Sequence, residues 1–263
     1  MQRLNPIDVD GLKAQFRAVP PFPHMKIDNF LQEDFAEEIY NSFPSFAEAE
    51  ANGKSFQALN ERGKVQVTDS EKFPAPIKEL HDTLASAEFR ETLGEIVGIP
   101  NLLADEYLVG GGIHETRRSG HLDVHIDFNY IEERQLHRRL NILVFFNKEW
   151  KEEYGGLLEL WDLQVKNREQ AFVPVFNRCC VFETSDISWH GVTAVQCPEN
   201  MSRKSFAGYY YTKEAPAHWK GEAHTTIFKA RPNEVLKGSV LMPWNDFKSK
   251  AKRLLRRAKA KLK

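Results

Sequence analysis

The chain has 263 residues, of which 41% are hydrophobic and 28% are charged, so it can bury the core of a large globular domain. No apolar run approaches the roughly 18 residues that span a membrane. The opening sequence MQRLNPIDVDGLKAQF also lacks the apolar core of a secretion signal. The three cysteines, Cys179, Cys180 and Cys197, are odd in number and two are adjacent, which argues against a disulfide framework or a structural zinc site. We therefore expect a reducing, cytoplasmic compartment.

The first part of the chain, 1–103, predicts a mainly helical support region. Residues 20–30 are proline-rich and predict an extended entry segment. Residues 32–43 have acidic residues early and apolar residues at helical spacing, which predicts a helix. The polar stretch 50–75 predicts loop with weak strand. Residues 76–98 predict two short helices that end at Gly98.

After residue 104 the pattern changes to short β-rich runs separated by turn residues. Eight such strands are predicted: 106–109, 121–127, 141–146, 157–161, 171–175, 179–183, 191–195 and 205–212. No strand–helix alternation is present, which argues against a parallel α/β sheet. The predicted fold class is therefore mainly β with flanking helices (α+β), in which a jelly roll over 104–215 is buttressed by the N-terminal helices.

The C-terminal part has two predicted segments, an irregular extension over 216–245 and a basic amphipathic helix over 246–263. The helix segment has nine Lys or Arg and one Asp, a charge of +8 that leaves −9 on the rest of a chain whose total is −1. Such a helix can be solvated, lie on an anionic membrane surface or touch nucleic acid non-specifically. The acidic body argues against specific nucleic-acid recognition.

A metal site is indicated by the sequence HLDVHIDFNY over 121–130, which contains His-x-Asp twice, as His121/Asp123 and His125/Asp127. All four residues share one parity, so on a strand they would face the same side. His190, just before a predicted strand, is the best third ligand. Two histidines and one carboxylate leave coordination positions open, as non-haem Fe(II) requires. A chance His-x-Asp pair and a structural His190 are the alternative interpretation.

A carboxylate site is indicated further along, because Arg203 and Ser205 lie two apart on the last predicted strand. A guanidinium beside a hydroxyl suits a carboxylate ligand. The order of a His-x-Asp pair, a distant histidine and then Arg-x-Ser is far less expected by chance than any one part.

Together these motifs resemble the Fe(II)/2-oxoglutarate-dependent dioxygenase superfamily, most closely its prolyl-4-hydroxylase-like branch. The similarity rests on HIDFN (125–129), HRRLNILVFFNKEW (137–150), GGLLELW (155–161), WHGV (189–192) and RKSFAGYYY (203–211), with PFPHMKIDNFL (21–31) in support. The resemblance implies a double-stranded β-helix, the jelly roll of this superfamily.

The resemblance also implies roles for individual residues. His125, Asp127 and His190 would hold iron, and Arg203, assisted by Ser205, would bind the distal carboxylate of 2-oxoglutarate. His125/Asp127 fits better than His121/Asp123 because the family has an apolar or aromatic residue after the Asp, here Phe128. Lys204 is the alternative to Arg203, but it would face the opposite side of the strand.

Weaker candidates are residues whose interpretation as core or surface is at least as good. The resemblance places Asn141, Phe145 and Tyr209 beside the co-substrate pocket and His114, Tyr107 and Asn129 near its mouth. The basic stretch 137–139 could meet an anionic substrate or be a solvated strand entry. Trp150 and Trp161 are expected in the core.

The function implied is hydroxylation of an unactivated C–H bond, with 2-oxoglutarate and O₂ as co-substrates, succinate and CO₂ as products, and ascorbate (vitamin C) as a further candidate cofactor. A carboxylate at position 127 favours hydroxylation over halogenation. The substrate could be a small molecule, a glycan or a prolyl peptide. Competing hypotheses are a non-catalytic β-sandwich binding module and a membrane-surface protein acting through the basic C-terminal helix.

Overall fold

The computed structural model describes residues 2–242. The basic helix expected over 246–263 therefore lies outside the described residues. No helix in the described part is long and apolar enough to cross a membrane. All three cysteines are free and buried.

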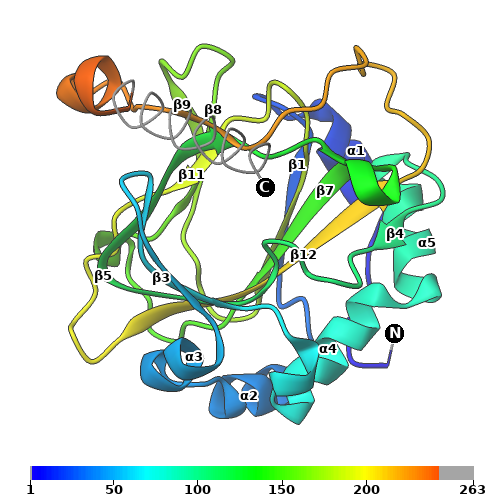
Figure 1. Ribbon diagram of the computed structural model, residues 1–263. Coiled ribbons are helices and arrows are strands. Elements are labelled where there is room, and N and C mark those ends of the chain that lie inside the picture. Colours follow the sequence, from blue (N-terminus) through cyan, green and yellow to red (C-terminus); the bar gives the residue numbers. More distant parts are fainter. Residues whose placement is uncertain (1, 243–263) are drawn as a thin grey trace, which may run out of the picture.

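The described residues form one curled antiparallel sheet (Figure 1). Its main path runs β1-β10-β7-β12-β5-β11-β8-β9, and β2, β3, β4, β6 and β13 pair beside it. The sheet curls so that β8 and β11 lie on the opposite side from β7 and β12 (Figure 1). This arrangement confirms the predicted jelly roll. The strands of the main path are β1 (His24–Asp28), β5 (Gly112–Ile126), β7 (Leu136–Phe145), β8 (Leu158–Trp161), β9 (Arg168–Phe172), β10 (Arg178–Glu183), β11 (His190–Val192) and β12 (Ser202–Thr212).

The helices cover the outer face of β7 and β12, as alternation along the strands requires. Along β7, Leu140, Ile142 and Val144 are buried against the helices in the main hydrophobic cluster. Asn141 and Leu143, at the intervening positions, line a cavity on the inner face of the sheet. One strand therefore supplies both the core and the wall of a pocket.

Most predicted helices are confirmed. α2 (Glu33–Ser42) covers the expected segment, and 76–98 holds α4 (Ala75–Ala85) and α5 (Ala87–Val97). Gly98 ends α5 in the left-handed conformation at φ +72°, where a glycine has no Cβ penalty. α1 (Val9–Ala18) and the short α3 (Phe46–Asn52) were not predicted.

The segment 50–75, predicted as loop with weak strand, contains two strands, β2 (Lys54–Gln57) and β3 (Glu61–Val67). β3 pairs with β5, and its polar residues alternate with buried Val65 and Val67, so the strand signal is weak. The predicted entry segment is extended and includes β1, which joins the sheet beside β10. Strands from the predicted support region are thus part of the same sheet.

The predicted strand over 106–109 is also wrong. The strand here, β4, is Leu103–Ala104, and the chain then turns because the Asp105 carboxylate accepts hydrogen bonds from the backbone of Tyr107 and Val109. β5 and β7 begin nine and five residues before the predicted starts, at Gly112 and Leu136, and β9 is shifted toward the N-terminus.

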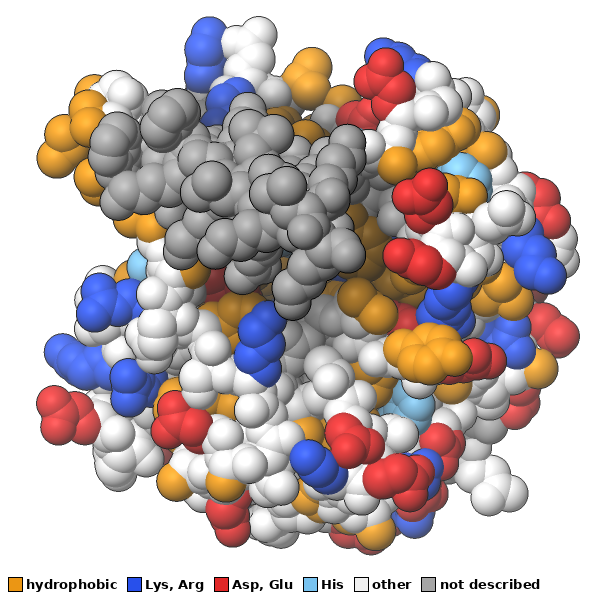
Figure 2. Space-filling model, viewed as in Figure 1, with side chains coloured by type: hydrophobic (Ala, Val, Ile, Leu, Met, Phe, Trp, Pro, Cys, Tyr) orange, Lys and Arg blue, Asp and Glu red, His pale blue; other side chains and the backbone are white. Residues whose placement is uncertain are grey.

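The expected irregular extension over 216–245 contains regular structure. β13 (Ile227–Lys229) pairs with β5, and a helical turn spans Lys237–Leu241. β6 (Tyr130–Ile131) completes the set of strands. Val235, Leu236 and Val240 are exposed, and hydrophobic side chains gather at the upper left of Figure 2, where Figure 1 places this turn.

Candidate metal centre

His125, Asp127 and His190 converge at one end of the curled sheet. β5 places His125 directly opposite His190, the first residue of β11, and Asp127 follows the end of β5. One ligand atom from each lies within 4.8 Å of the others. The distances are 3.5 Å from His125 Nε2 to Asp127 Oδ1 and 3.4 Å from His190 Nε2 to Asp127 Oδ2. Among residues 2–242, this is the one such group of His, Cys, Asp or Glu.

Both histidines are oriented in the same way, by a hydrogen bond from Nδ1 to the backbone carbonyl two residues earlier. Nδ1 of His125 is 2.8 Å from the Asp123 carbonyl, and Nδ1 of His190 is 2.8 Å from the Ser188 carbonyl. A carbonyl oxygen only accepts, so each Nδ1 carries the proton and Nε2 of the neutral ring has a free lone pair. The Nε2 lone pairs of His125 and His190 and the Asp127 carboxylate face one another, and a cation bound between them would satisfy all three. The donor set thus fits Fe(II).

The protonation states of the site favour metal binding. Burial would raise the pKa of Asp127, but Arg138 and His190 outweigh it and hold that pKa well below its ordinary value. Burial, together with the neighbouring His125, lowers the pKa of His190 despite the nearby carboxylate. An ionised carboxylate beside a neutral imidazole is the form that a metal ion requires.

Asp127 is held by two further residues of β7, Arg138 and Asn141. Asn141 Nδ2 donates to Asp127 Oδ2 at 2.8 Å, and Arg138 Nη2 lies 3.0 Å from the same oxygen. Arg138 also donates to Asn141 Oδ1, at 3.0 Å from Nε and 2.8 Å from Nη2. Asn141 was predicted beside the co-substrate, but its amide is occupied by the metal-site carboxylate. Arg138 belongs to the basic stretch 137–139, for which the sequence predicted either contact with an anionic substrate or a solvated strand entry. The structure instead places it beside Asp127.

The second His-x-Asp pair does not join the site. β5 has a bulge where it meets β11, since His190 lies opposite His125 but Val192 lies opposite Leu122. A bulge breaks the strict alternation of side chains, so the predicted common face is wrong. Asp123 is fully buried outside the cavity and pairs with Lys237 Nζ at 2.6 Å, whereas His121 lines the cavity.

Arg203 lines the same cavity, and its guanidinium has one N–H donor group that no described residue uses. Its Nε donates to the Gly156 carbonyl at 2.6 Å and its Nη1 to Ser205 Oγ at 3.2 Å. Nη2 is buried and has no partner among the described residues. Burial lowers the pKa of Arg203 to about 10. A buried guanidinium with a free donor fits an incoming carboxylate, such as one end of 2-oxoglutarate.

The surroundings of Arg203 explain why residue 156 is a glycine and why Arg203, rather than Lys204, faces the cavity. Gly156 has φ +67°, and a Cβ there would lie 2.8 Å from Arg203 Cδ, so a glycine is required for the guanidinium to lie in this position. The ammonium of Lys204 instead lies over the rings of Tyr40 and Phe43, outside the cavity. The predicted preference for Arg203 over Lys204 therefore agrees with the direction of the side chains.

The cavity has a volume of about 320 Å³. Tyr209 and His114 line it as expected, and both contact the Gly110 carbonyl. Phe145 is buried with its ring 5.0 Å from the Arg203 guanidinium carbon. Trp150 and Trp161 are buried, as predicted. The residues that sequence reasoning did not single out include Leu143, Leu158, Phe182, Thr226 and Phe228.

Two residues expected near the mouth of the cavity do not line it. Tyr107 is 65% exposed and stacks with Arg134. Asn129 makes hydrogen bonds to the backbone of Glu222 and His224. Asn129 therefore holds the C-terminal extension in place and does not line the cavity.

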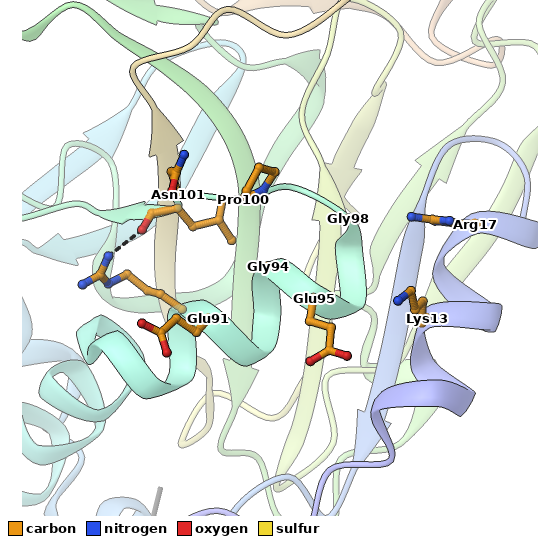
Figure 3. A pocket seen from close by; sticks show the side chains of 10 residues that line it. Lys13, Arg17, Glu91, Gly94, Glu95, Gly98, Pro100 and Asn101 are labelled. Carbon is orange, nitrogen blue, oxygen red and sulfur yellow. Dashed lines mark hydrogen bonds between the residues drawn. The ribbon is translucent and has the colours of Figure 1, made fainter.

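A larger cavity of about 640 Å³ lies between α1 and α5, away from the metal centre (Figure 3). Lys13, Arg17, Glu91 and Glu95 surround it, and their charges are mixed in sign. Its Arg90 is already used, since Nη1 donates to the Leu102 carbonyl at 2.6 Å. Among residues 2–242, no group of three potential metal ligands gathers in this cavity.

Comparison with known proteins agrees with this geometry. Residues 111–211 match the family model of the 2OG-Fe(II) oxygenase superfamily. The chain is 28% identical over 207 residues to the prolyl 3-hydroxylase OGFOD1 of Mus musculus, a match that covers 73% of this chain and 33% of that protein. The match thus spans about a third of the length of this curated relative.

Similar folds occur in solved structures. A Pseudomonas putida prolyl-4-hydroxylase superposes with a TM-score of 0.55 at 14% identity, covering 76% of this chain and 97% of that one. A Trichoplax adhaerens prolyl hydroxylase, in complex with a hypoxia-inducible-factor peptide fragment, gives 0.54 at 17% identity, covering 77% and 88%. Identities this low show a shared fold.

Proposed function

We propose that this chain, which belongs to the 2OG-Fe(II) oxygenase superfamily, is a 2-oxoglutarate-dependent hydroxylase whose iron is held by His125, Asp127 and His190. The observation that carries the proposal is that one cavity is lined by two complementary groups. Three metal-ligand side chains converge in it, and Arg203, which also lines it, has a buried donor without a partner among the described residues. A metal chelator with a distal carboxylate would use both groups.

The bound iron would supply the activation of O₂ that breaks an unactivated C–H bond. The chain's own residues bind and orient. Arg203 and Ser205 would hold the distal carboxylate of 2-oxoglutarate. Arg138 and Asn141 would keep one Asp127 oxygen occupied, so that the other faces the metal. Leu143, Leu158 and Phe182 would make the cavity walls apolar and limit water.

A prolyl residue in a peptide is the first substrate class to test. The support is that all three of these relatives bear the names of prolyl hydroxylases, and that one of them was solved in complex with a peptide fragment. A small molecule and a glycan stay the alternatives. The site carboxylate at position 127 supports hydroxylation.

The test is succinate formation by the purified chain with Fe(II), 2-oxoglutarate and a panel of prolyl peptides, with the peptide mass measured in parallel. A mass gain of one oxygen that depends on Fe(II) and 2-oxoglutarate supports the proposal. Binding of Co(II) in place of Fe(II), measured by visible absorption, is read separately. A chain that binds neither metal nor 2-oxoglutarate would instead be a non-catalytic β-sandwich.

Three finer expectations extend the proposal. Ascorbate would serve as an accessory reductant, which omission from the assay tests. The free, buried cysteines suit a reducing cytoplasmic compartment, which fractionation of cells tests. Weak association of 246–263 with anionic membranes concerns residues outside the described part, and liposome co-sedimentation with and without them tests it.

A further inference from the structure

The C-terminal extension reaches the metal centre through β13. This strand pairs with β5 at the residues that carry the site, with Phe228 opposite His125 and Lys229 opposite Val124. β3 pairs with β5 only as far as Leu122, so β13 takes over beyond that point. The extension crosses the same end of the curled sheet as β8 and β11 (Figure 1). It lies beyond the segment 111–211 that matches the family model.

Phe228 is the part of the extension that faces the site. Its ring centroid lies 5.5 Å from that of the metal-site His125, with 37° between the ring planes. Phe228 and Thr226 line the cavity that holds the three metal-ligand residues. Ile227, the residue between them, is 43% exposed and does not line the cavity. Alternation along β13 therefore directs Phe228 inward and Ile227 outward.

Residues 222–238 of the C-terminal extension, called the strap, include β13. Hydrogen bonds attach the beginning of the strap to the rest of the protein. Asn129 Nδ2 donates to the Glu222 carbonyl at 3.1 Å, and the His224 backbone N–H donates to Asn129 Oδ1 at 2.9 Å. His224 Nε2 lies 3.1 Å from the Asp186 carboxylate. The strap is thus joined to the loop after β5, through Asn129, and to the loop before β11, through Asp186.

Buried ion pairs attach the other end of the strap. Arg231 Nη2 lies 2.8 Å from Glu159 Oε1, and Lys237 Nζ lies 2.6 Å from Asp123 Oδ1. Glu159 and Asp123 are 1% and 0% exposed and belong to β8 and β5. The body supplies the carboxylates and the strap supplies the cations. Because a buried carboxylate without a partner is costly, this charge match favours one docked position.

We propose that the strap is the outer wall of the active-site cavity and that Phe228 limits the width of the group that reaches the metal. This inference rests on the proposed function. The wall selects a narrow reacting group, such as a ring or chain end presented edge-on, and rejects branched or fused-ring groups at the metal. Phe228 acts as a specificity-determining residue, and Arg231 acts as a positioning residue for it.

The experiment measures the size selectivity of the metal's open positions without using catalysis. Co(II) replaces Fe(II), and its visible spectrum reports the binding of two probes, imidazole and the wider phenylimidazole. In the native chain imidazole should bind more tightly than phenylimidazole. Phe228→Ala should improve phenylimidazole binding about tenfold and leave imidazole within about twofold, since removing a wall group relieves a steric block. Phe228→Leu should lie between.

The matched control is Ile227→Ala, which removes an outward side chain from the same strand and should leave both affinities unchanged. Arg231→Gln should raise phenylimidazole affinity as Phe228→Ala does, while Lys213→Ala, at an exposed position before the strap, should not. Hydrogen exchange of the β13 amides should also become at least about tenfold faster in Arg231→Gln, because a buried pair is broken.

The outcomes separate this inference from the proposed function. If the native chain binds no Co(II), the metal site itself fails. If Co(II) binds and Phe228→Ala leaves the ratio of the two probe affinities unchanged, or weakens phenylimidazole, the wall assignment is overturned. If Arg231→Gln changes neither the ratio nor the exchange of β13, the ion pairs do not position the strap.

Discussion

Arg138 Nη2 lies 3.0 Å from Asp127 Oδ2. The guanidinium carbon also lies over two rings, 3.6 Å from the centroid of Tyr209 and 4.7 Å from that of Phe128. A metal-site carboxylate is therefore shared between a buried cation of the protein and the ion that the site would hold. Asn141 bonds to both partners and fixes their relative position.

Replacing Arg138 should destabilise the metal-free protein more than the metal-bound protein. Arg138→Met leaves Asp127 ionised and short of a partner, which costs about 3–5 kcal/mol for a buried pair. A bound cation supplies part of the lost charge, so the loss with saturating Co(II) should be smaller. Unfolding in denaturant with and without Co(II) measures both. Arg139→Met is the control, because Arg139 donates to Thr212 and not to Asp127.

The outcome that contradicts this relationship is an equal loss of stability with and without metal. Arg138 would then be a structural residue of the pocket wall that does not share Asp127 with the ion.

Arg203 should determine the affinity for 2-oxoglutarate. Arg203→Met removes the buried donor and should raise the Kd of the Co(II)-loaded chain for 2-oxoglutarate at least about thirtyfold, the equivalent of ~2 kcal/mol. Isothermal titration measures it. Lys204→Met should leave the Kd unchanged because that ammonium lies over Tyr40 and Phe43. The reverse result, with Lys204 essential and Arg203 dispensable, would move the carboxylate site.

The two His-x-Asp pairs should differ sharply under substitution. Asp127→Ala should abolish hydroxylation and weaken metal binding, since it removes the only carboxylate of the triad. Asp123→Asn should retain Co(II) binding, because Asp123 lies outside the cavity and pairs with Lys237. Titration with Co(II) followed by visible absorption compares them. Full activity in Asp127→Ala would remove Asp127 from the triad.

Glu115 should make the stability depend on pH. Burial raises the pKa of Glu115 from 4.5 to about 7, although Ser202 and Lys204 act in the opposite direction. A raised pKa means that the folded state holds the proton more tightly than the unfolded state. The stability contribution is therefore fully present below about pH 4.5, falls as the pH rises to about 7 and amounts to about 3 kcal/mol.

Glu115→Gln imitates the protonated form and should flatten this dependence. The free energy of unfolding at about pH 5 and about pH 8 should differ less in the variant than in the native chain. Glu95→Gln, an exposed position on α5, is the control. An identical pH dependence in Glu115→Gln and the native chain would show that Glu115 titrates near its ordinary pKa when folded.

Much of the site could be predicted because its residues lie in short local patterns. His125 and Asp127 are two apart, and so are Arg203 and Ser205. The structure brings His125, Asp127, His190 and Arg203 into one cavity, with Ser205 bonded to Arg203. α2, α4 and α5 could be predicted for the same reason, because their apolar residues recur at helical spacing and Gly98 ends α5. The bounds of the polar β3 could not be predicted, because its pairing with β5 outweighs its weak strand preference. The turn after Asp105 was not predicted, because the Asp105 side chain accepts hydrogen bonds from the backbone that follows it.

By itself, the sequence predicted the fold class, from the succession of short strands, and the candidate residues of the site, from two short motifs and a resemblance to a known family. Only the tertiary structure decided which His-x-Asp pair reaches the cavity, because a bulge in β5 turns Asp123 away. It alone also joined Arg138 and Asn141 to Asp127 and brought Phe228 beside His125. These contacts depend on strand pairing between distant segments, which local patterns do not encode.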